Sequence, residues 1–337
     1  MKSWCKDIRN YGLCWLLILV SCTASHHRVL KESDFHKTVV LSPAPKLTFE
    51  TTNIMDFAIK GDRVIIRNSL RDDSIFMIYS VPDCRLLSAF GNKGRGEGEW
   101  LMPVFAKTYP DSMLMIYDAG KNNFYTLNVL HDKVDPVPDY ACLCDNAQEI
   151  VYLPDSCLIL NIINKSENLI VKHKKSSEVV LYDFPDLSVS LKDPQAYSGF
   201  MQANPITGDI VYVYQYLRRF DILSSAGELK SMNTFDPAGY PVLRGHRLDY
   251  ANSITYYFGV MTTENSIYLY YVGKAGKEIA DDCGISTYVE EYDWDGNPVK
   301  KYKLDRFVKY LGYAKDCFIG VTPDGEAPFV AYKLLDE

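Results

Sequence analysis

From about position 47 onward, short apolar runs alternate with clusters of Asp, Gly, Ser and Asn, and almost no helical periodicity is present. Apolar runs of four to eight residues between turn-forming residues are typical of short β-strands. In the run IVYVYQY, every second residue from Ile210 to Tyr216 would point to one face, and Val211 and Val213 would point to the other. Both faces are apolar, so we expect this strand to be covered on both sides.

One unit recurs along this region: a turn of Asp, Gly or Ser, an apolar strand, a polar gap and a second strand that ends in a hairpin. The units begin at positions 61, 111, 155, 208, 265 and 316, about 50 residues apart. This spacing suits four-stranded propeller blades. Ala226-Gly227 and Asp295-Gly296 are expected to form hairpin turns, because Gly tolerates positive φ. The sequence therefore predicts an all-β fold, a six-bladed β-propeller over residues 46–337.

Closure of such a ring requires a last blade that is built from both ends of the chain. We expect Leu47–Thr51 to pair into the blade that holds Cys317–Lys333. An array of two-sheet sandwiches and an eight-stranded barrel with extensions are the alternatives. The sequence lacks the regular Pro/Ser linkers of a sandwich array, and a barrel would leave much of the chain unexplained.

The N-terminus follows a different pattern, in which a basic stretch, an apolar run and small residues succeed one another as in a secretory signal. Lys2, Lys6 and Arg9 precede the apolar run Leu13–Val20. Such a run spans only about 12 Å as a helix, whereas the hydrocarbon core of a bilayer is about 30 Å thick. The run is too short to remain as a transmembrane anchor, so residues 1–21 are predicted to be a signal peptide.

The apolar run ends in Leu19-Val20-Ser21-Cys22, which resembles the lipobox of bacterial lipoproteins. In that family the Cys thiol is the nucleophile that takes diacylglycerol, and cleavage leaves the acylated Cys at the N-terminus. We therefore predict lipidation at Cys22, with the membrane as a partner through this anchor. A secreted protein in which Cys22 is incidental is the alternative. Residues 22–45 are mostly polar and are expected to be the lipidated N-terminus and a tether.

These features predict a location in the bacterial cell envelope. The outer membrane is the favoured membrane, and whether the protein faces the periplasm or the cell surface stays open. The net charge of −7 and the lack of a basic cluster with interleaved aromatics argue against nucleic acid as a partner. Beyond the first 22 residues the cysteines are even in number, and their pairing is left open; they are Cys84, Cys142, Cys144, Cys157, Cys283 and Cys317.

The chain resembles the TolB-like six-bladed propeller lipoproteins of Bacteroides and relatives, the BF3164-like group. The lipobox, the segment Phe76–Phe90 and above all the run FGNKGRGEGEW, which ends at Trp100, carry the resemblance. That run is similar to the family's G-x-x-G-x-G-P-x-E-F loop, with Gly98 where Pro is common and Trp100 where Phe is common. The resemblance covers nearly the whole mature chain. It implies a propeller fold and a location in the cell envelope. It implies no ligand and no catalytic residue.

Five residues are candidates for ligand binding. Lys93, Arg95 and Trp100 belong to the glycine-rich run, whose backbone N–H groups could hold an anion. The run matches no phosphate-binding fingerprint, so a tight structural turn is the favoured interpretation. Arg218 and Arg219 follow a buried strand and could line the ring axis or a pocket on one face. For these two, solvation or pairing with Asp221 is favoured.

No H-E-x-x-H or G-x-S-x-G motif occurs, and we predict no catalytic residue, no metal ligand and no cofactor. The favoured hypothesis is a membrane-anchored envelope lipoprotein whose propeller binds or scaffolds a protein, peptide or glycan. The alternative is a metal-dependent propeller hydrolase or lyase that acts on a glycan, lactone or peptide. A metal site with one ligand from each blade would not be visible in the sequence spacing, so enzyme activity is disfavoured rather than excluded.

Overall fold

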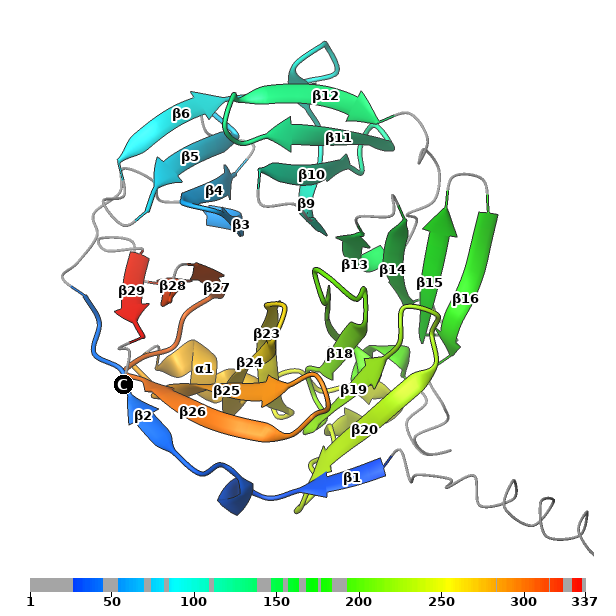
Figure 1. Ribbon diagram of the computed structural model, residues 1–337, viewed down its shortest axis with the longest axis vertical. Helices are drawn as coiled ribbons and strands as arrows, with labels where there is room; N and C mark the ends of the chain where they lie inside the picture. Colours follow the sequence, from blue (N-terminus) through cyan, green and yellow to red (C-terminus); the bar gives the residue numbers. More distant parts are fainter. Residues whose placement is uncertain are drawn as a thin grey trace, which may run out of the picture.

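The structure is a computed structural model, and its described residues are 27–44, 54–69, 74–81, 85–108, 112–137, 147–153, 157–163, 168–174, 177–183, 193–282, 284–314, 316–323 and 329–334. Within these ranges, six antiparallel blades follow one another around a common axis (Figure 1). The first strand of each blade lies nearest the axis and the last lies at the rim. The predicted propeller is confirmed in architecture and in the order of its units.

The first three blades form the first half of the ring. Blade 1 contains β3 (Ile54–Lys60), β4 (Arg63–Asn68), β5 (Phe76–Ser80) and β6 (Leu86–Phe90). Blade 2 contains β9 (Pro103–Thr108), β10 (Met113–Asp118), β11 (Asn123–Asn128) and β12 (Lys133–Val137). Blade 3 contains β13 (Ala147–Tyr152), β14 (Leu158–Ile163), β15 (Asn168–Lys174) and β16 (Ser177–Asp183). A short parallel pairing of β9 with β13 joins blades 2 and 3 into one eight-stranded sheet.

The other three blades complete the ring. Blade 4 contains β17 (Gly199–Ala203), β18 (Ile210–Tyr214), β19 (Arg219–Leu223) and β20 (Leu229–Phe235). Blade 5 contains β23 (Ile254–Thr262), β24 (Ser266–Ala275), β25 (Thr287–Asp293) and β26 (Pro298–Leu304). The described part of blade 6 contains β27 (Tyr310–Ala314), β28 (Cys317–Val321) and β29 (Phe329–Lys333). Smaller elements are η3 (Pro194–Tyr197), the hairpin of β21 (Leu243–Arg244) and β22 (Arg247–Leu248), and α1 (Gly276–Asp281).

The sequence repeat marks one equivalent position, the turn between the first and second strand of a blade. Gly61, Gly208 and Asp316 occupy this turn in blades 1, 4 and 6, each with φ between 57° and 73°. Glycine and aspartate are among the residues that reach this left-handed region most readily. The turns near positions 111 and 155 fall partly or wholly outside the described residues, but the strands that flank them keep the same order.

The apolar side chains of β18 are divided between two interblade cores. Val211 and Val213 pack with Tyr257 and Leu269 of blade 5. On its opposite face, β18 contributes Ile210, Tyr212 and Tyr214 to a core that includes residues of blade 3. The expectation that this strand is covered on both sides is confirmed. Each such burial removes a large apolar side chain from water and stabilises the fold by roughly 1.5–3 kcal/mol.

The N-terminal segment, residues 27–44, forms a strap along the outer rim of three blades (Figure 1). Within it, β1 (His27–Leu30) pairs in parallel with β20, and β2 (Thr38–Val40) pairs in parallel with β26. The short 3-10 helix η1 (Glu32–Asp34) lies between them. At its end, Pro43 bridges to Tyr332 of β29, and the Ala44 N–H donates to the Ala331 carbonyl.

The strap corrects the expected tether over residues 22–45, because its described part is docked on the body. Leu30, Phe35 and Leu41 are buried in the cores between blades, at 6%, 8% and 4% exposure. Three apolar residues spaced through a polar segment give little periodicity, so the sequence pattern resembles a tether. In the structure, these residues anchor a chain that also pairs with the otherwise open edges of β20 and β26.

The predicted closure of the ring involves a segment that the structure does not describe, so it stays a prediction. Leu47–Thr51, which we expect in blade 6, lie outside the described residues. The neighbouring Pro43 and Ala44 contact β29, so the N-terminal chain does meet the last blade. No helix in the described part of the chain is long and apolar enough to cross a bilayer.

Candidate functional site

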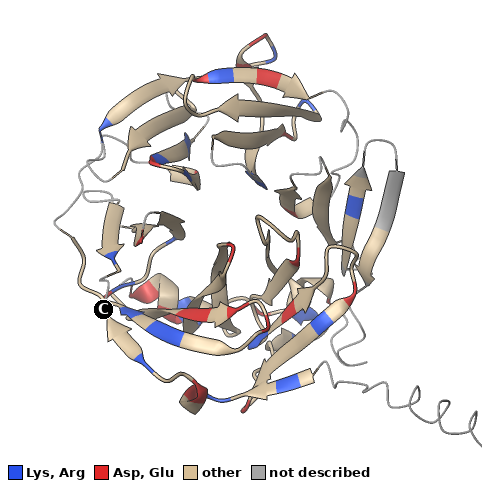
Figure 2. Ribbon diagram, in the orientation of Figure 1, with Lys and Arg blue, Asp and Glu red and all other residues tan. Residues whose placement is uncertain are grey.

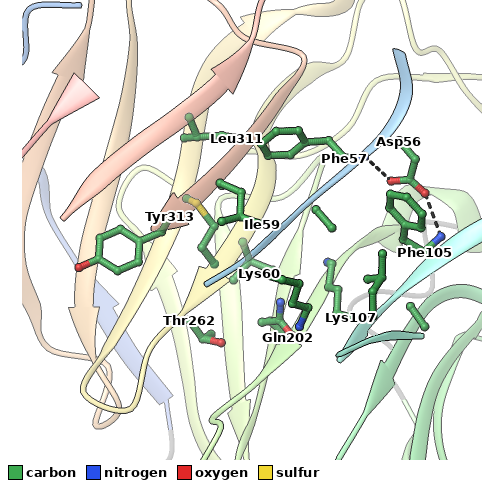
Figure 3. A pocket seen from close by; sticks show the side chains of 16 residues that line it. Asp56, Phe57, Ile59, Lys60, Phe105, Lys107, Gln202, Thr262, Leu311 and Tyr313 are labelled. Atoms are coloured by element: carbon green, nitrogen blue, oxygen red, sulfur yellow. Dashed lines mark hydrogen bonds between the residues drawn. The ribbon is translucent and has the colours of Figure 1, made fainter. Parts of the chain in front are cut away.

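The first strands of the blades surround a cavity of about 220 Å³ at the centre of the ring (Figure 3). Residues of β3, β9, β17, β23 and β27 line it, so five blades contribute. A second cavity of about 480 Å³ lies between β3, β9 and β13 and shares Asp56, Phe105 and Lys107 with the first. These shared residues make the two cavities neighbours, and we refer to them together as the channel.

Polar side chains from four blades gather in the first cavity. Lys60 of β3, Lys107 of β9, Gln202 of β17 and Thr262 of β23 line it together (Figure 3). All four stand at or near the end of a first strand, shortly before the equivalent turn of their blade. Because the first strands run side by side around the axis, this shared position brings polar groups from separate blades to one level of the channel.

Lys107 connects three blades across the channel. Its Nζ lies 2.5 Å from Oε2 of Glu149 on β13 and donates to the Met201 carbonyl of β17 at 3.0 Å. Both partners of the ion pair are partly exposed, at 30% for Lys107 and 16% for Glu149. The pair is therefore in contact with the solvent of the channel and available to a ligand that enters it.

Asp56 lies where the two cavities meet. Its carboxylate accepts hydrogen bonds from the Phe57 N–H and the Phe105 N–H, both at 2.9 Å (Figure 3). Burial raises the pKa of Asp56 above its ordinary value, although these two bonds and the nearby Arg67 guanidinium oppose the shift. A carboxyl group held this way positions β3 against β9 and adds a titratable group to the channel.

The channel offers binding chemistry rather than a recognisable catalytic arrangement. The described residues that line it include both signs of charge, an amide and a hydroxyl, but no Ser, Cys or His. Elsewhere in the described ranges, no group of three or more His, Cys, Asp or Glu side chains is placed to hold a metal ion. A few polar groups in a partly apolar concave site are typical of small-molecule binding.

The glycine-rich run does not assemble the three residues predicted from it. Lys93 and Arg95 are exposed on a loop between blades 1 and 2, formed by β7 (Asn92–Lys93) and β8 (Glu99–Trp100). The Gly96 N–H donates to the Glu99 carboxylate at 2.7 Å. This backbone donor is therefore satisfied by an acidic side chain of the same loop. This arrangement supports the structural interpretation of the loop.

Trp100 is a core residue rather than a ligand contact. It is 2% exposed and packs edge-on against Phe76 and Tyr125, with ring centroids 5.0 Å and 4.8 Å away. This placement corrects its choice as a binding candidate. The sequence signal was misleading because an aromatic residue after a glycine loop can close the loop onto the core or face a ligand.

Arg219 forms the pair with Asp221 that the sequence favours. Its guanidinium contacts both carboxylate oxygens at 2.8 and 2.6 Å, and both side chains are buried. The Tyr214 hydroxyl donates to the same carboxylate at 2.7 Å. Neither Arg219 nor Arg218 lines the channel.

Arg218 joins the strap to blades 4 and 5. It pairs with Glu32 of η1 and with Glu290 of β25, and it lies over the Phe235 ring at 4.0 Å. Lys301 of β26 contacts the same two carboxylates, at 2.7 Å from Glu32 and 2.9 Å from Glu290. This cluster is structural, because it holds η1 against the rim.

Two of the cysteines beyond the signal peptide lie among the described residues. Cys157 is fully buried at the start of β14, and Cys317 carries a free thiol at the start of β28. The other four, Cys84, Cys142, Cys144 and Cys283, lie outside the described residues, as does Cys22. Their pairing and the predicted lipidation stay predictions.

The sequence analysis missed the polar residues of the channel, because the repeat marks the region in which they lie but not their positions. When the units are aligned on their starts, Lys60, Gln202 and Thr262 stand one, six and three residues before positions 61, 208 and 265. Lys60 and Thr262 are the last residues of β3 and β23, and Gln202 is the next to last residue of β17. Because these offsets differ, an alignment of the units would point to the ends of the first strands but would not select these three positions.

Comparison with known proteins gives a family and a fold. A family model described as TolB-like 6-blade propeller-like matches residues 34–312. No curated protein matches the sequence. Among solved structures, a DUF4221 family member from Bacteroides vulgatus is similar at a TM-score of 0.62 and 10% identity, over 88% of this chain and 97% of that one.

Two more structures from the same genus are similar. One is a Bacteroides fragilis protein with a provisional description as exported, at a TM-score of 0.53 and 11% identity, over 89% of this chain and 99% of that one. The other is a protein of unknown function from Bacteroides thetaiotaomicron, at a TM-score of 0.51 and 10% identity, over 88% of this chain and 74% of that one. Because the sequence identities are only 10–11%, these structural similarities show a shared fold and nothing further.

Proposed function

Because the chain belongs to the TolB-like six-bladed propeller family, we propose that it is a lipid-anchored binding protein of the bacterial cell envelope whose channel holds a small polar ligand. The observation that carries the binding role is the set of Lys60, Lys107, Gln202 and Thr262, which four blades bring to one cavity. The lipobox at Cys22 and the likeness to a Bacteroides protein described as exported support the location.

The size of the channel limits what it can hold. The cavities, of about 220 and 480 Å³, lie below and near the lower end of the roughly 300–1,000 Å³ of typical small-molecule sites, so a single sugar unit or the end of a short peptide suits them better than a larger ligand. The Lys107–Glu149 pair offers a charge of each sign, and Gln202 and Thr262 offer neutral hydrogen-bonding groups. A folded partner protein would have to bind outside the channel.

Binding in the channel is tested with a panel of envelope glycan fragments and short peptides, screened by thermal shift on the full-length protein in detergent. We expect a hit whose affinity falls about tenfold in Gln202→Leu, because an unpaired polar group of the ligand remains buried there. The control is Lys133→Met on β12, the outermost strand of blade 2, which should leave that affinity unchanged. A hit that binds Gln202→Leu as tightly as the wild type would contradict the channel as its site.

Anchoring is tested by cell fractionation of a Cys22→Ala variant. The wild type should sediment with membranes, and the variant should be recovered without lipid or retain an uncleaved signal peptide. Recovery of a mature, cleaved variant in the membrane fraction would contradict lipid anchoring through Cys22.

The metal-dependent hydrolase or lyase remains the alternative, and no observation in the channel favours it. Elemental analysis of the purified protein separates the two hypotheses. One equivalent of tightly bound calcium or zinc would favour the enzyme. An activity on lactone or glycan substrates that disappears when the metal is removed would establish it.

A further inference from the structure

The proposed anchor and the rim of the propeller are close together along the chain. Cys22 precedes His27, the first residue of β1, by five positions. Five residues extend over at most about 18 Å. The point of lipidation therefore reaches only a short distance from the edge of blade 4, where β1 pairs with β20.

The strap is held firmly enough that it cannot lengthen this connection. Leu30 and Phe35 are buried in the core between blades 4 and 5. Glu32 is bound by both Arg218 and Lys301. To release even the first half of the strap, the protein would have to expose two large apolar side chains and leave Arg218 and Lys301 with Glu290 alone of their two shared carboxylates.

The rim that the strap covers differs in charge from the whole molecule. The strap and β26 together carry six Lys or Arg side chains and two acidic ones, whereas the chain as a whole has a net charge of −7. Figure 2 shows the basic segments on β1, on β26 and on the chain between η1 and β2. Lys301 of β26 is buried and pairs with Glu32 and Glu290, so five of the six basic side chains and one acid, Asp34, remain outside that cluster.

The outward side of the strap also carries exposed apolar groups. Val29 is 56% exposed on β1, and Val40 is 72% exposed on β2. Basic side chains beside small apolar ones suit the interface of an anionic bilayer, where the cations meet headgroup phosphates and the apolar groups enter the boundary region. Near such a surface the attraction falls off within about a Debye length, so the short link to the lipid matters.

We propose that the strap lies against the anionic headgroups of the membrane, so that the propeller stands edge-on and its channel opens to the side. The proposal rests on lipidation at Cys22. In this orientation blades 4 and 5 face the lipid, and β12 of blade 2 lies on the far rim (Figure 1). The membrane then contacts the outer strands and not the first strands that line the channel, so a ligand can bind without displacing the protein from the membrane.

The orientation is tested by lysine footprinting of the full-length lipidated protein. The protein is reconstituted into vesicles of phosphatidylglycerol and phosphatidylcholine, and is labelled with a membrane-impermeant amine reagent that mass spectrometry maps. Lys31 and Lys37 report on the strap. Lys133 of β12 is the control on the far rim, and Lys277 of α1 is the control at the end of the channel where β23 begins.

Labelling of Lys31 and Lys37 should fall at least about fivefold in the vesicles relative to detergent, while Lys133 and Lys277 stay within about twofold. In vesicles of phosphatidylcholine alone, the protection should weaken, because the anionic headgroups are missing. Protection of Lys277 without Lys31 would indicate a face-on protein and overturn the proposal. Equal labelling at all four positions would indicate a freely hanging body and also overturn it.

The outcome separates this inference from the proposed anchor. A protein that floats with the vesicles but leaves Lys31 and Lys37 unprotected is anchored, and only the edge-on orientation is then wrong. A protein that does not float with the vesicles lacks the anchor, and both the anchoring and the orientation are then wrong.

Discussion

At the scale of single residues, the chain buries charge in pairs on its strands. Arg219 and Asp221 are two positions apart on β19, so their side chains lie on the same face, and Tyr214 of the adjacent β18 completes the cluster. Such a pair tolerates the loss of one member poorly, because the remaining charge has neither water nor a partner.

We predict that Arg219→Met lowers the free energy of unfolding by about 3–5 kcal/mol, because Asp221 would be left as a buried, uncompensated charge. Lys133→Met is the matched control, since Lys133 pairs with Asp135 at 2.9 Å on the exposed rim. That change should cost less than about 1 kcal/mol. Urea unfolding measures both, and similar losses in the two variants would contradict the structural role of the buried pair.

Asp56 should make stability depend on pH in a direction that its environment sets. The folded state raises the pKa of this carboxyl group, chiefly through burial. Protons are therefore bound more tightly in the folded state, so the contribution of Asp56 is most favourable below its unfolded pKa of about 3.8 and decreases as the pH rises toward its folded pKa.

We predict that Asp56→Asn, which does not titrate, gains stability relative to the wild type between pH 4 and pH 7. Urea unfolding at both pH values gives the difference between the two proteins. A difference that is constant, or that shifts in favour of the wild type as the pH rises, would show that the folded state does not raise this pKa.

Residue roles were the part that the sequence predicted least well. The pairing of Arg219 with Asp221 could be anticipated, because an arginine and an aspartate two positions apart on a strand share a face. Trp100 could not be assigned, since its burial depends on Phe76 and Tyr125 from other strands. Lys107 was missed for the same reason, because its partners Glu149 and Met201 belong to two other blades.

At the scale of elements, the strap shows how a polar segment becomes part of a β-fold. Its two strands satisfy the outer edges of β20 and β26, which would otherwise present unpaired backbone groups. The sequence predicted the blade strands well because their turns and alternation are local features. The sequence predicts a tether here because the pairing of the strap depends on strands more than 200 residues away.

We predict that Phe35→Ala destabilises the protein by about 3–5 kcal/mol, as for a large aromatic side chain removed from a core. Phe35 is 8% exposed and packs edge-on against Tyr292 of blade 5 at 5.5 Å. The neighbouring His36 is exposed, so His36→Ala should change stability by no more than about 0.5 kcal/mol. Thermal or urea unfolding that finds both variants equal to the wild type would contradict the docking of the strap.

At the scale of the whole molecule, the repeat and its turns were enough to predict the number and order of blades. The six unit starts in the sequence correspond to one equivalent turn per blade, and the family model covers residues 34–312. The channel could not be predicted, because it exists only where first strands from different blades meet. The anchor is predicted from the sequence alone, since Cys22 lies outside the described residues.

The most direct test of a lipid-anchored propeller is the mass of the N-terminal peptide of the mature protein, purified from membranes and digested. The account predicts that this peptide begins at Cys22 and carries the added mass of a diacylglycerol group on the thiol. A mature chain that begins at another residue, or one in which Cys22 has an unmodified thiol, would contradict it.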